Sequence, residues 1–208
     1  DKVIMINNHQ PPPFDARKIR DIWENNLYRN SKITRFKKVL RQTPINRYYQ
    51  RRTKRERIKS IVKMGFNEFQ LEFIDHHTAH AYTAYFGSDY YNSDEKVLVF
   101  TLDGGGDGLC ATVSIGCNGR LERISETKDL HSLGNIYSRI TFMLGFVPWE
   151  HEYKLMGMAP YVRKEYGAQS YNIFSSYLGF ESDTSLTFKK KIPESTSLLY
   201  KRMLTDTR

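Results

Sequence analysis

Residues 97–108 read VLVFTLDGGGDG, and this stretch sets the expected fold of the chain around it. Its first six residues are almost continuously apolar, which is typical of a buried β-strand. A carboxylate follows, and then four glycines within five positions. Glycines let backbone N–H groups approach an anion closely. The pattern predicts a strand over 97–102, ending in Asp103 and followed by a turn over 103–108.

Further strand signals follow this turn directly. Residues 109–115 suit a second strand, and Asn118-Gly119 is a strong hairpin dipeptide. A third strand is expected over 121–124, so the three strands form an antiparallel meander. Upstream, the alternation of Phe69, Leu71 and Phe73 predicts a strand over 67–75.

The rest of the chain alternates between helical and strand patterns, which indicates an α/β protein. No motif is recognisable after residue 162. We expect the chain to be part of a longer protein, truncated at both ends. The remaining predicted elements are a strand over 2–7, helices over 21–40 and 46–64 with a break at Pro44, a helix over 77–86, a helix over 132–146 with Ile136, Ile140 and Met143 on one side, and a loop or helix start over 148–162.

The net charge of +9 in 208 residues is concentrated in one region. Residues 11–70 hold 17 Lys and Arg against 5 Asp and Glu, and the remainder holds 15 against 18. The run RRTKRERIKS at 51–60 is either a nucleic-acid footprint or a solvated helix face. Apolar residues recur at helical spacing among the charges, at Ile58, Ile61 and Val62. This spacing favours the solvated face, and nucleic acid is not the expected partner.

Compartment and membrane association follow from cysteine usage and hydropathy. The only cysteines, Cys110 and Cys117, fall on opposite faces of a regular strand, so they are not expected to form a disulfide. Without a disulfide framework, the expected compartment is the reducing cytoplasm. The longest apolar runs are far shorter than the roughly 20 residues that a membrane span needs, so no membrane partner is expected.

Three of the six histidines lie at 76, 77 and 80, in the sequence HHTAHA. His76 and His80 are spaced i, i+4, so both imidazoles can project from one helix face, while His77 points elsewhere. Such a pair suits zinc, iron or manganese, although structural histidines also produce this spacing. The zinc-protease motif needs Glu directly after the first histidine, and His77 at that position excludes it. The pair predicts either a metal site or a polar corner of the fold.

The glycine turn favours the metal site over the polar corner. Its backbone N–H groups could bind a phosphate, and Asp103 could hold the metal that bridges the phosphates. The alternative is an ordinary tight hairpin turn. Farther on, Lys154 could contact a phosphate, or it could form a surface charge pair beside a packed loop. The candidate phosphate-binding residues are Gly104, Gly105, Gly106, Asp107, Gly108 and Lys154.

Four motifs in order resemble the N-terminal domain of the O-carbamoyltransferases, a family that includes nodulation-factor and antibiotic-tailoring enzymes. They are DHHTAHAYTAYF, VLVFTLDGGGDG, SLGNIYSRITFMLGF and EYKLMGMAPY. The resemblance is clear over about 72–161. It implies the actin-like, sugar-kinase-like ATPase fold around a nucleotide cleft. It also implies a metal, usually iron, on His76, His80 and Asp103, with manganese or zinc as the other ions considered.

The resemblance further implies the chemistry. Carbamoyl-adenylate, made from carbamoyl phosphate and ATP, would pass its carbamoyl group to a hydroxyl of a small-molecule or sugar acceptor. The domain that makes the adenylate lies outside this chain, and residues 1–208 would be part of one N-terminal domain. A further metal-binding Asp of the family has no convincing candidate after Tyr161. No general base is evident: a metal-bound water, His77 or the substrate could serve. The alternative is an actin-like nucleotide- or RNA-binding module, including a relative of the tRNA threonylcarbamoyl transferases.

Overall fold

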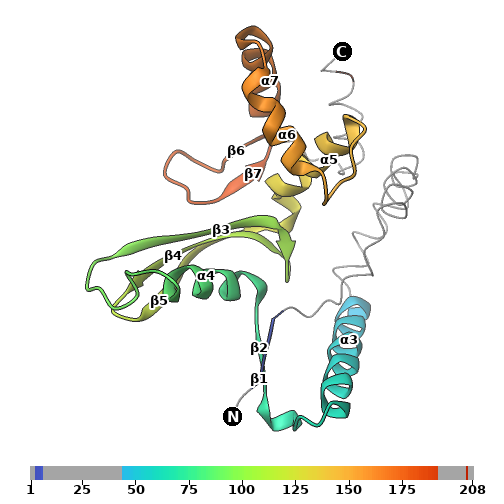
Figure 1. Ribbon diagram of the computed structural model, residues 1–208, viewed down its shortest axis with the longest axis vertical. Coiled ribbons are helices and arrows are strands. Elements are labelled where there is room, and N and C mark those ends of the chain that lie inside the picture. Colours follow the sequence, from blue (N-terminus) through green and yellow to red (C-terminus); the bar gives the residue numbers. More distant parts are fainter. Residues whose placement is uncertain (1–2, 7–43, 192–204, 206–208) are drawn as a thin grey trace.

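The computed structural model describes residues 3–6, 44–191 and 205, and it is a mixed α/β structure (Figure 1). The helix predicted over 21–40 lies outside the described residues. The elements in chain order are β1 (Val3–Ile6), α3 (Pro44–Lys63), β2 (Leu71–Ile74), α4 (His76–Phe86), β3 (Val97–Gly106), β4 (Leu109–Cys117), β5 (Arg120–Lys128), α5 (Leu133–Met143), α6 (Glu152–Met158), α7 (Lys164–Tyr177), β6 (Leu178–Phe180) and β7 (Phe188–Lys190), with short 3-10 turns η1 (Glu68–Gln70), η2 (Asp129–His131) and η3 (Ala159–Tyr161).

The predicted meander is confirmed: β3, β4 and β5 form an antiparallel sheet in that order. Asn118 and Gly119 make the second turn with positive φ angles of 50° and 69°, as the dipeptide predicts. The first turn is shorter than the expected 103–108, because β3 continues to Gly106. Asp107 and Gly108 have φ angles of 51° and 90°, and these two residues alone supply the conformation that a two-residue hairpin needs.

Two other pairs of strands flank this sheet. Strand β1 pairs in parallel with β2, and β6 pairs antiparallel with β7. The strand predicted over 67–75 begins only at Leu71, so that expectation is wrong at its start. Asn67 and Gln70 form a reciprocal capping box that closes η1, and Phe69 is left 97% exposed. Local side-chain hydrogen bonds thus override the alternating pattern.

Helix α4 lies along one side of the meander (Figure 1). Ala81 and Tyr85 of the helix are buried against Val99 of β3. The Tyr85 ring fits over Gly116, where a Cβ would come within 2.4 Å of it. The Tyr85 hydroxyl donates to the Tyr91 carbonyl at 3.0 Å and accepts from the Gly119 N–H at 3.2 Å. These contacts fix the C-terminal end of α4 on the sheet.

A second apolar cluster joins α5 to the end of α7. Ile136 and Tyr177 are its buried members, and Ile140 and Met143 pack against them. The side of α5 predicted from the sequence is therefore the side that packs. Helix α7 and the β6–β7 hairpin, which follow residue 162, carried no signal that the sequence analysis recognised.

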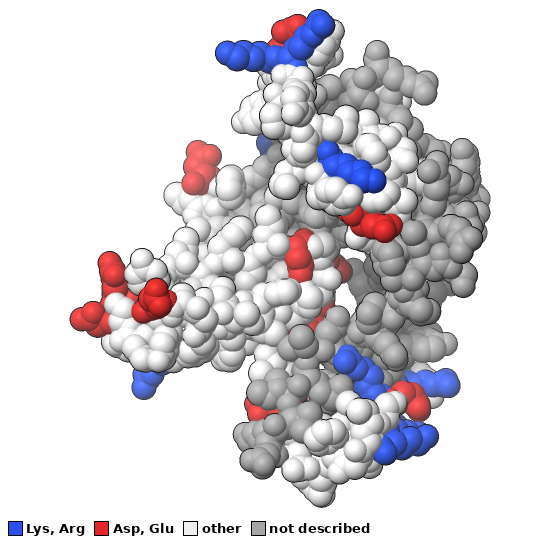
Figure 2. Space-filling view, in the orientation of Figure 1, with Lys and Arg blue, Asp and Glu red and all other residues white. Residues whose placement is uncertain are grey.

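Several basic residues lie over α3, at the lower end of the molecule, and others lie at the opposite end (Figure 2). Most of the charged side chains in the middle of this helix are exposed. Arg57, Ile58 and Ile61 are partly buried, and Val62 is exposed. The interpretation of α3 as a solvated helix face stays a prediction. None of the helices in the described segments is both long enough and apolar enough to cross a membrane.

Candidate metal and phosphate site

The N-terminus of α4 is anchored by Asp75, which comes directly after β2. Its carboxylate accepts the Thr78 N–H at 3.0 Å as the helix cap, and it also accepts two contacts from the Arg123 guanidinium at 2.8 and 3.0 Å. Burial raises the pKa of Asp75, but the hydrogen bonds from Thr78 and Arg123 outweigh it and leave the pKa below its ordinary value. This anchor fixes the direction in which His76, the first residue of the helix, projects.

Three side chains meet above this anchor: His76, His80 and Asp103. The Nε2 atom of His76 lies 2.5 Å from Asp103 Oδ2 and 3.1 Å from His80 Nε2. The Nε2 atom of His80 lies 3.6 Å from the same carboxylate oxygen. The structure thus brings together the three residues that the sequence predicted as ligands, although 27 residues of chain separate His76 from Asp103.

The donor set fits a divalent transition metal. Metal–nitrogen and metal–oxygen bonds of about 2.0–2.2 Å place neighbouring ligand atoms roughly 3 Å apart, and the three atoms here span that value. Two imidazole nitrogens and a carboxylate oxygen suit zinc, iron or manganese. Among the described residues, these three form the cluster that could hold such an ion. One cation would satisfy all three converging acceptors at once.

The glycine hairpin packs directly onto the first ligand. A Cβ on Gly106 would lie 2.2 Å from the Cγ atom of the His76 ring. The Asp107 carboxylate accepts the His76 backbone N–H at 3.0 Å, beside the Asp75 cap. In contrast, nothing lies within 4 Å of a Cβ built on Gly104 or on Gly108. Gly105 has a φ of 135° and faces Asp129 and Leu109. The turn therefore serves partly to seat the imidazole, a structural use that the sequence analysis did not foresee.

His77 faces Oδ1 of Asp103, whereas His76 and His80 face Oδ2. It is fully buried, and its Nδ1 is 2.9 Å from the Thr101 hydroxyl. Its Nε2 lies 3.4 Å from Asp103 Oδ1. The expectation that His77 points elsewhere is thus right about the ligand cluster but incomplete. Its full burial does not favour His77 as a general base, because a base must reach the proton that it abstracts.

The start of α5 supports the backbone around Asp103. The Ser132 hydroxyl caps this helix by accepting the Asn135 N–H at 3.0 Å, and it donates to the Asp103 carbonyl at 3.3 Å. The Asn135 side-chain amide donates to the Gly104 carbonyl at 3.0 Å. Gly134 allows the close approach, since a Cβ there would lie 2.9 Å from the Asp103 carbonyl oxygen.

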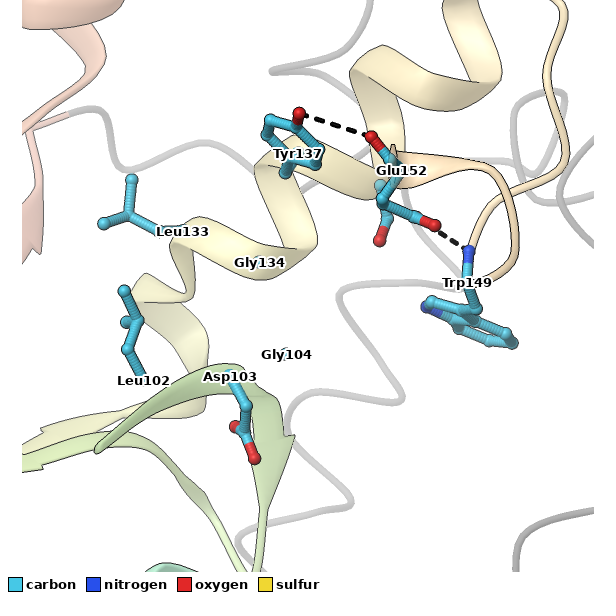
Figure 3. A pocket seen from close by; sticks show the side chains of 9 residues that line it. Leu102, Asp103, Gly104, Leu133, Gly134, Tyr137, Trp149 and Glu152 are labelled. Carbon is cyan, nitrogen blue, oxygen red and sulfur yellow. Dashed lines mark hydrogen bonds between the residues drawn. The ribbon is translucent and has the colours of Figure 1, made fainter. Parts of the chain in front are cut away.

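A cavity of about 430 Å³ opens between this helix start and α6 (Figure 3). Tyr137 and Trp149 contribute aromatic rings to its lining, and Gly104 forms part of its floor. The Glu152 carboxylate accepts a hydrogen bond from the backbone N–H of Trp149 at 2.7 Å. The Asp103 side chain points away from the cavity, so the cavity and the metal cluster lie on two sides of the end of β3 (Figure 3). The bare backbone at Gly104 separates them.

A family model for the carbamoyltransferase N-terminus matches residues 21–206. The chain belongs to the carbamoyltransferase family. It is 37% identical over 108 residues to the uncharacterized protein MJ1051 of Methanocaldococcus jannaschii. This match covers 51% of the chain and 20% of MJ1051. It is 33% identical over 92 residues to the nodulation protein NolNO of Sinorhizobium fredii, and this match covers 44% of the chain and 13% of NolNO. It is 34% identical over 107 residues to the nodulation protein NolO of Bradyrhizobium diazoefficiens, and this match covers 50% of the chain and 19% of NolO. The chain spans a fifth or less of these curated relatives.

Lys154 of this carbamoyltransferase domain is placed apart from the metal cluster. Its ammonium group lies 5.6 Å from the centre of the Phe146 ring and 5.8 Å from that of Tyr153. It is not among the residues that line the cavity, whereas Glu152 of the same helix is. A phosphate contact by Lys154 therefore stays a prediction.

Both cysteines of the carbamoyltransferase domain are free thiols. Cys110 is fully buried behind the site. Burial, together with the charges of Asp129 and Asp103, raises the pKa of the Cys110 thiol to about 12. The thiol stays protonated near neutral pH, so it is not a nucleophile here.

The sequence analysis missed several residues that shape the site. Asp75 was interpreted only as the end of a strand, although an Asp directly before a helical pattern is a capping signal. Ser132 carries the same kind of signal before α5. The partnership of Arg123 with Asp75 and the cavity position of Trp149 depend on tertiary contacts, and no local pattern marks them.

Proposed function

We propose that this domain binds one divalent metal ion between His76, His80 and Asp103 and serves carbamoyl transfer. The observation that carries the proposal is the convergence of these three side chains in a member of the carbamoyltransferase family. Iron is the expected ion, with manganese and zinc as alternatives, because all three accept imidazole and carboxylate ligands. The bound ion would supply Lewis acidity and neutralise phosphate charge.

The donor in this proposal is carbamoyl-adenylate, made from carbamoyl phosphate and ATP by a domain outside this chain. The acceptor hydroxyl oxygen attacks the carbamoyl carbon, and the bond from that carbon to the phosphate oxygen of AMP breaks. The hydroxyl proton leaves to a base, and the products are an O-carbamate and AMP. The acceptor in this proposal is a hydroxyl of a small molecule or a sugar.

The two sides of β3 would bind different parts of the adenylate: the cavity would bind the nucleoside, and the side of Asp103 would bind the phosphate. The cavity beside Tyr137 and Trp149 is wide enough for the nucleoside part of the adenylate, and aromatic rings suit a flat base. Gly104 carries no side chain, and its Cβ position is open, so a phosphate could pass this backbone towards Asp103. The proposed phosphate contact is the end of β3 together with its turn, which comprises Gly104, Gly105, Gly106, Asp107 and Gly108. An actin-like ATPase fold for the complete domain belongs to the same proposal.

Metal content tests the site. We expect about one ion per chain in wild-type protein after loading with Mn²⁺ and gel filtration, and almost none in His76→Ala or His80→Ala. His131→Ala is the matched control, because His131 accepts the Lys190 N–H at 3.1 Å, apart from the cluster. Metal retained in both cluster variants would refute the ligand assignment.

The reaction is tested on the full-length protein. We expect conversion of ATP to AMP and pyrophosphate only when carbamoyl phosphate is present, and transfer of label from carbamoyl phosphate to a polyhydroxylated acceptor. ATP consumption that is independent of carbamoyl phosphate would contradict carbamoyl chemistry and favour a nucleotide-binding module.

A further inference from the structure

A buried line of polar side chains runs from the centre of the sheet to Asp103. Thr112 of β4, Thr101 of β3 and His77 of α4 are its members, and their exposed fractions are 1%, 6% and 0%. The two threonine hydroxyl oxygens lie 2.7 Å apart, and Thr101 Oγ1 lies 2.9 Å from His77 Nδ1. Such groups lose their hydration on burial, so an apolar residue would be the simpler choice for a core position of this kind. Their presence behind a candidate ligand calls for a role.

One assignment of the two hydroxyl hydrogens makes the line donate towards Asp103. Thr101 Oγ1 already accepts the backbone N–H of Thr112 at 3.1 Å. If the Thr112 hydroxyl donates to the same oxygen, the Thr101 hydroxyl hydrogen is directed to His77 Nδ1. The neutral imidazole then carries its hydrogen on Nε2. Each donor along the line has an acceptor except that last N–H.

The last N–H lies next to an unpartnered acceptor. His77 Nε2 and Asp103 Oδ1 are both buried, and within the described part of the chain neither has a hydrogen-bond partner. They lie 3.4 Å apart. The other oxygen of the carboxylate, Oδ2, lies near His76 and His80. The two oxygens of Asp103 thus face two different sets of groups.

We propose that His77 is a positioning residue held by Thr101 and Thr112. It donates a hydrogen bond from Nε2 to Oδ1 of Asp103, so that Oδ2 is free to bind the metal. His77 acts through Asp103 and does not touch the ion. Partners behind a metal ligand restrict its orientation, and their loss typically weakens metal binding about 10- to 100-fold. This inference rests on the proposed metal site.

The test uses Thr101→Val, which removes the hydroxyl but keeps the shape of the side chain. We expect the Mn²⁺ dissociation constant, measured by competition with a chelator, to rise at least about tenfold. Thr101→Ser should restore binding to within a few-fold, because it returns the hydroxyl. Thr141→Val is the matched control: this buried hydroxyl donates to the Tyr137 carbonyl at 3.0 Å, within α5. It should bind Mn²⁺ like the wild type, even where its melting temperature falls.

A second variant, His77→Phe, fills the same space without a nitrogen atom. Pulsed EPR of bound Mn²⁺ should detect two imidazole nitrogens in both the wild type and this variant. Loss of one nitrogen would make His77 a ligand and overturn the inference. So would unchanged Mn²⁺ affinity in Thr101→Val, because the line of hydrogen bonds would then serve stability alone. Failure of wild-type protein to bind Mn²⁺ would instead remove the proposed metal site, and this inference with it.

Discussion

Gly106 offers the sharpest test of how the hairpin seats His76. In Gly106→Ala the new methyl carbon would lie 2.2, 2.4 and 2.6 Å from the Cγ, Cδ2 and Cβ atoms of His76. Carbon atoms in contact normally stay about 3.5–4.0 Å apart, so the imidazole must move by roughly 1 Å or more. A metal site tolerates ligand displacements of only about 0.2 Å. We therefore expect His76 to be lost as a ligand.

Two magnitudes follow from this displacement. Overpacking of this kind costs about 1–3 kcal/mol, which corresponds to about 2–4 °C in melting temperature per kcal/mol for a chain of this size. The Mn²⁺ affinity should fall at least about 100-fold, since even indirect partners of a ligand contribute 10- to 100-fold. Differential scanning fluorimetry of the metal-free protein and chelator competition measure the two effects separately.

Gly104→Ala is the matched control, two residues away on the same strand. No atom lies within 4 Å of its Cβ position, and its φ is not in the left-handed range. We expect this variant to bind Mn²⁺ like the wild type, with a stability change below about 0.5 kcal/mol. In a His76→Ala background, Gly106→Ala should weaken metal binding no further. Wild-type affinity in Gly106→Ala, or an equal loss in Gly104→Ala, would refute the reasoning.

Four other predictions concern further parts of the domain. Asp75→Ala should lower the free energy of unfolding by about 1–2 kcal/mol and Asp75→Asn by less, because Asn still caps α4; equal losses in urea titrations would contradict the capping role. Because the pKa of Asp75 is lowered, its charge stabilises the fold at pH values above the ordinary pKa of 3.8. The wild type should therefore be more stable than Asp75→Asn above that pH, and the difference should disappear as the pH falls through the folded-state pKa. A difference in stability that persisted at pH 2 would argue against this role of the charge. Cys110 should resist iodoacetamide at pH 8 until the protein is denatured, and mass spectrometry showing modification of the native protein would contradict its burial. A fourfold Gln replacement on α3 should change stability by less than about 1 kcal/mol, and submicromolar tRNA binding at physiological salt that this change abolished would make the helix an RNA surface. The four replaced residues are Arg51, Arg52, Lys54 and Arg55.

The sequence predicted the elements around the site well, since their signals are local. The i, i+4 histidines, the apolar strand before Asp103 and the Asn118-Gly119 turn each depend on a few neighbouring residues, and all three elements are present. The prediction of Asp103 as a third partner came from its place at the end of a strand and from the family resemblance. These two sources were sufficient to name the cluster before any distance was known.

The errors have equally definite causes. Phe69 fits an alternating strand pattern, yet the capping box of Asn67 with Gln70 holds this segment in a 3-10 turn. The hairpin turn was expected to be six residues long because glycines suggest turns, whereas Asp107 and Gly108 suffice to reverse the chain. The role of Gly106 could not be predicted, because the ring that it accommodates belongs to a residue 30 positions away.

The Tyr85 contact with Gly116 has a mechanical consequence for the metal cluster. An α-helix is stiff, and Tyr85 lies nine residues after His76, which places the two about 13.5 Å apart along the axis. The Tyr85 end is held between Gly116 and the hairpin at Asn118-Gly119, so a displacement there would be transmitted along the helix axis to the imidazoles. The Asn118-Gly119 hairpin, at the far end of the sheet from Asp103, is therefore expected to influence the position of α4. Because a stiff helix moves as one body, substitutions that shift this hairpin would change the position of both histidines relative to Asp103 without altering any residue of the cluster.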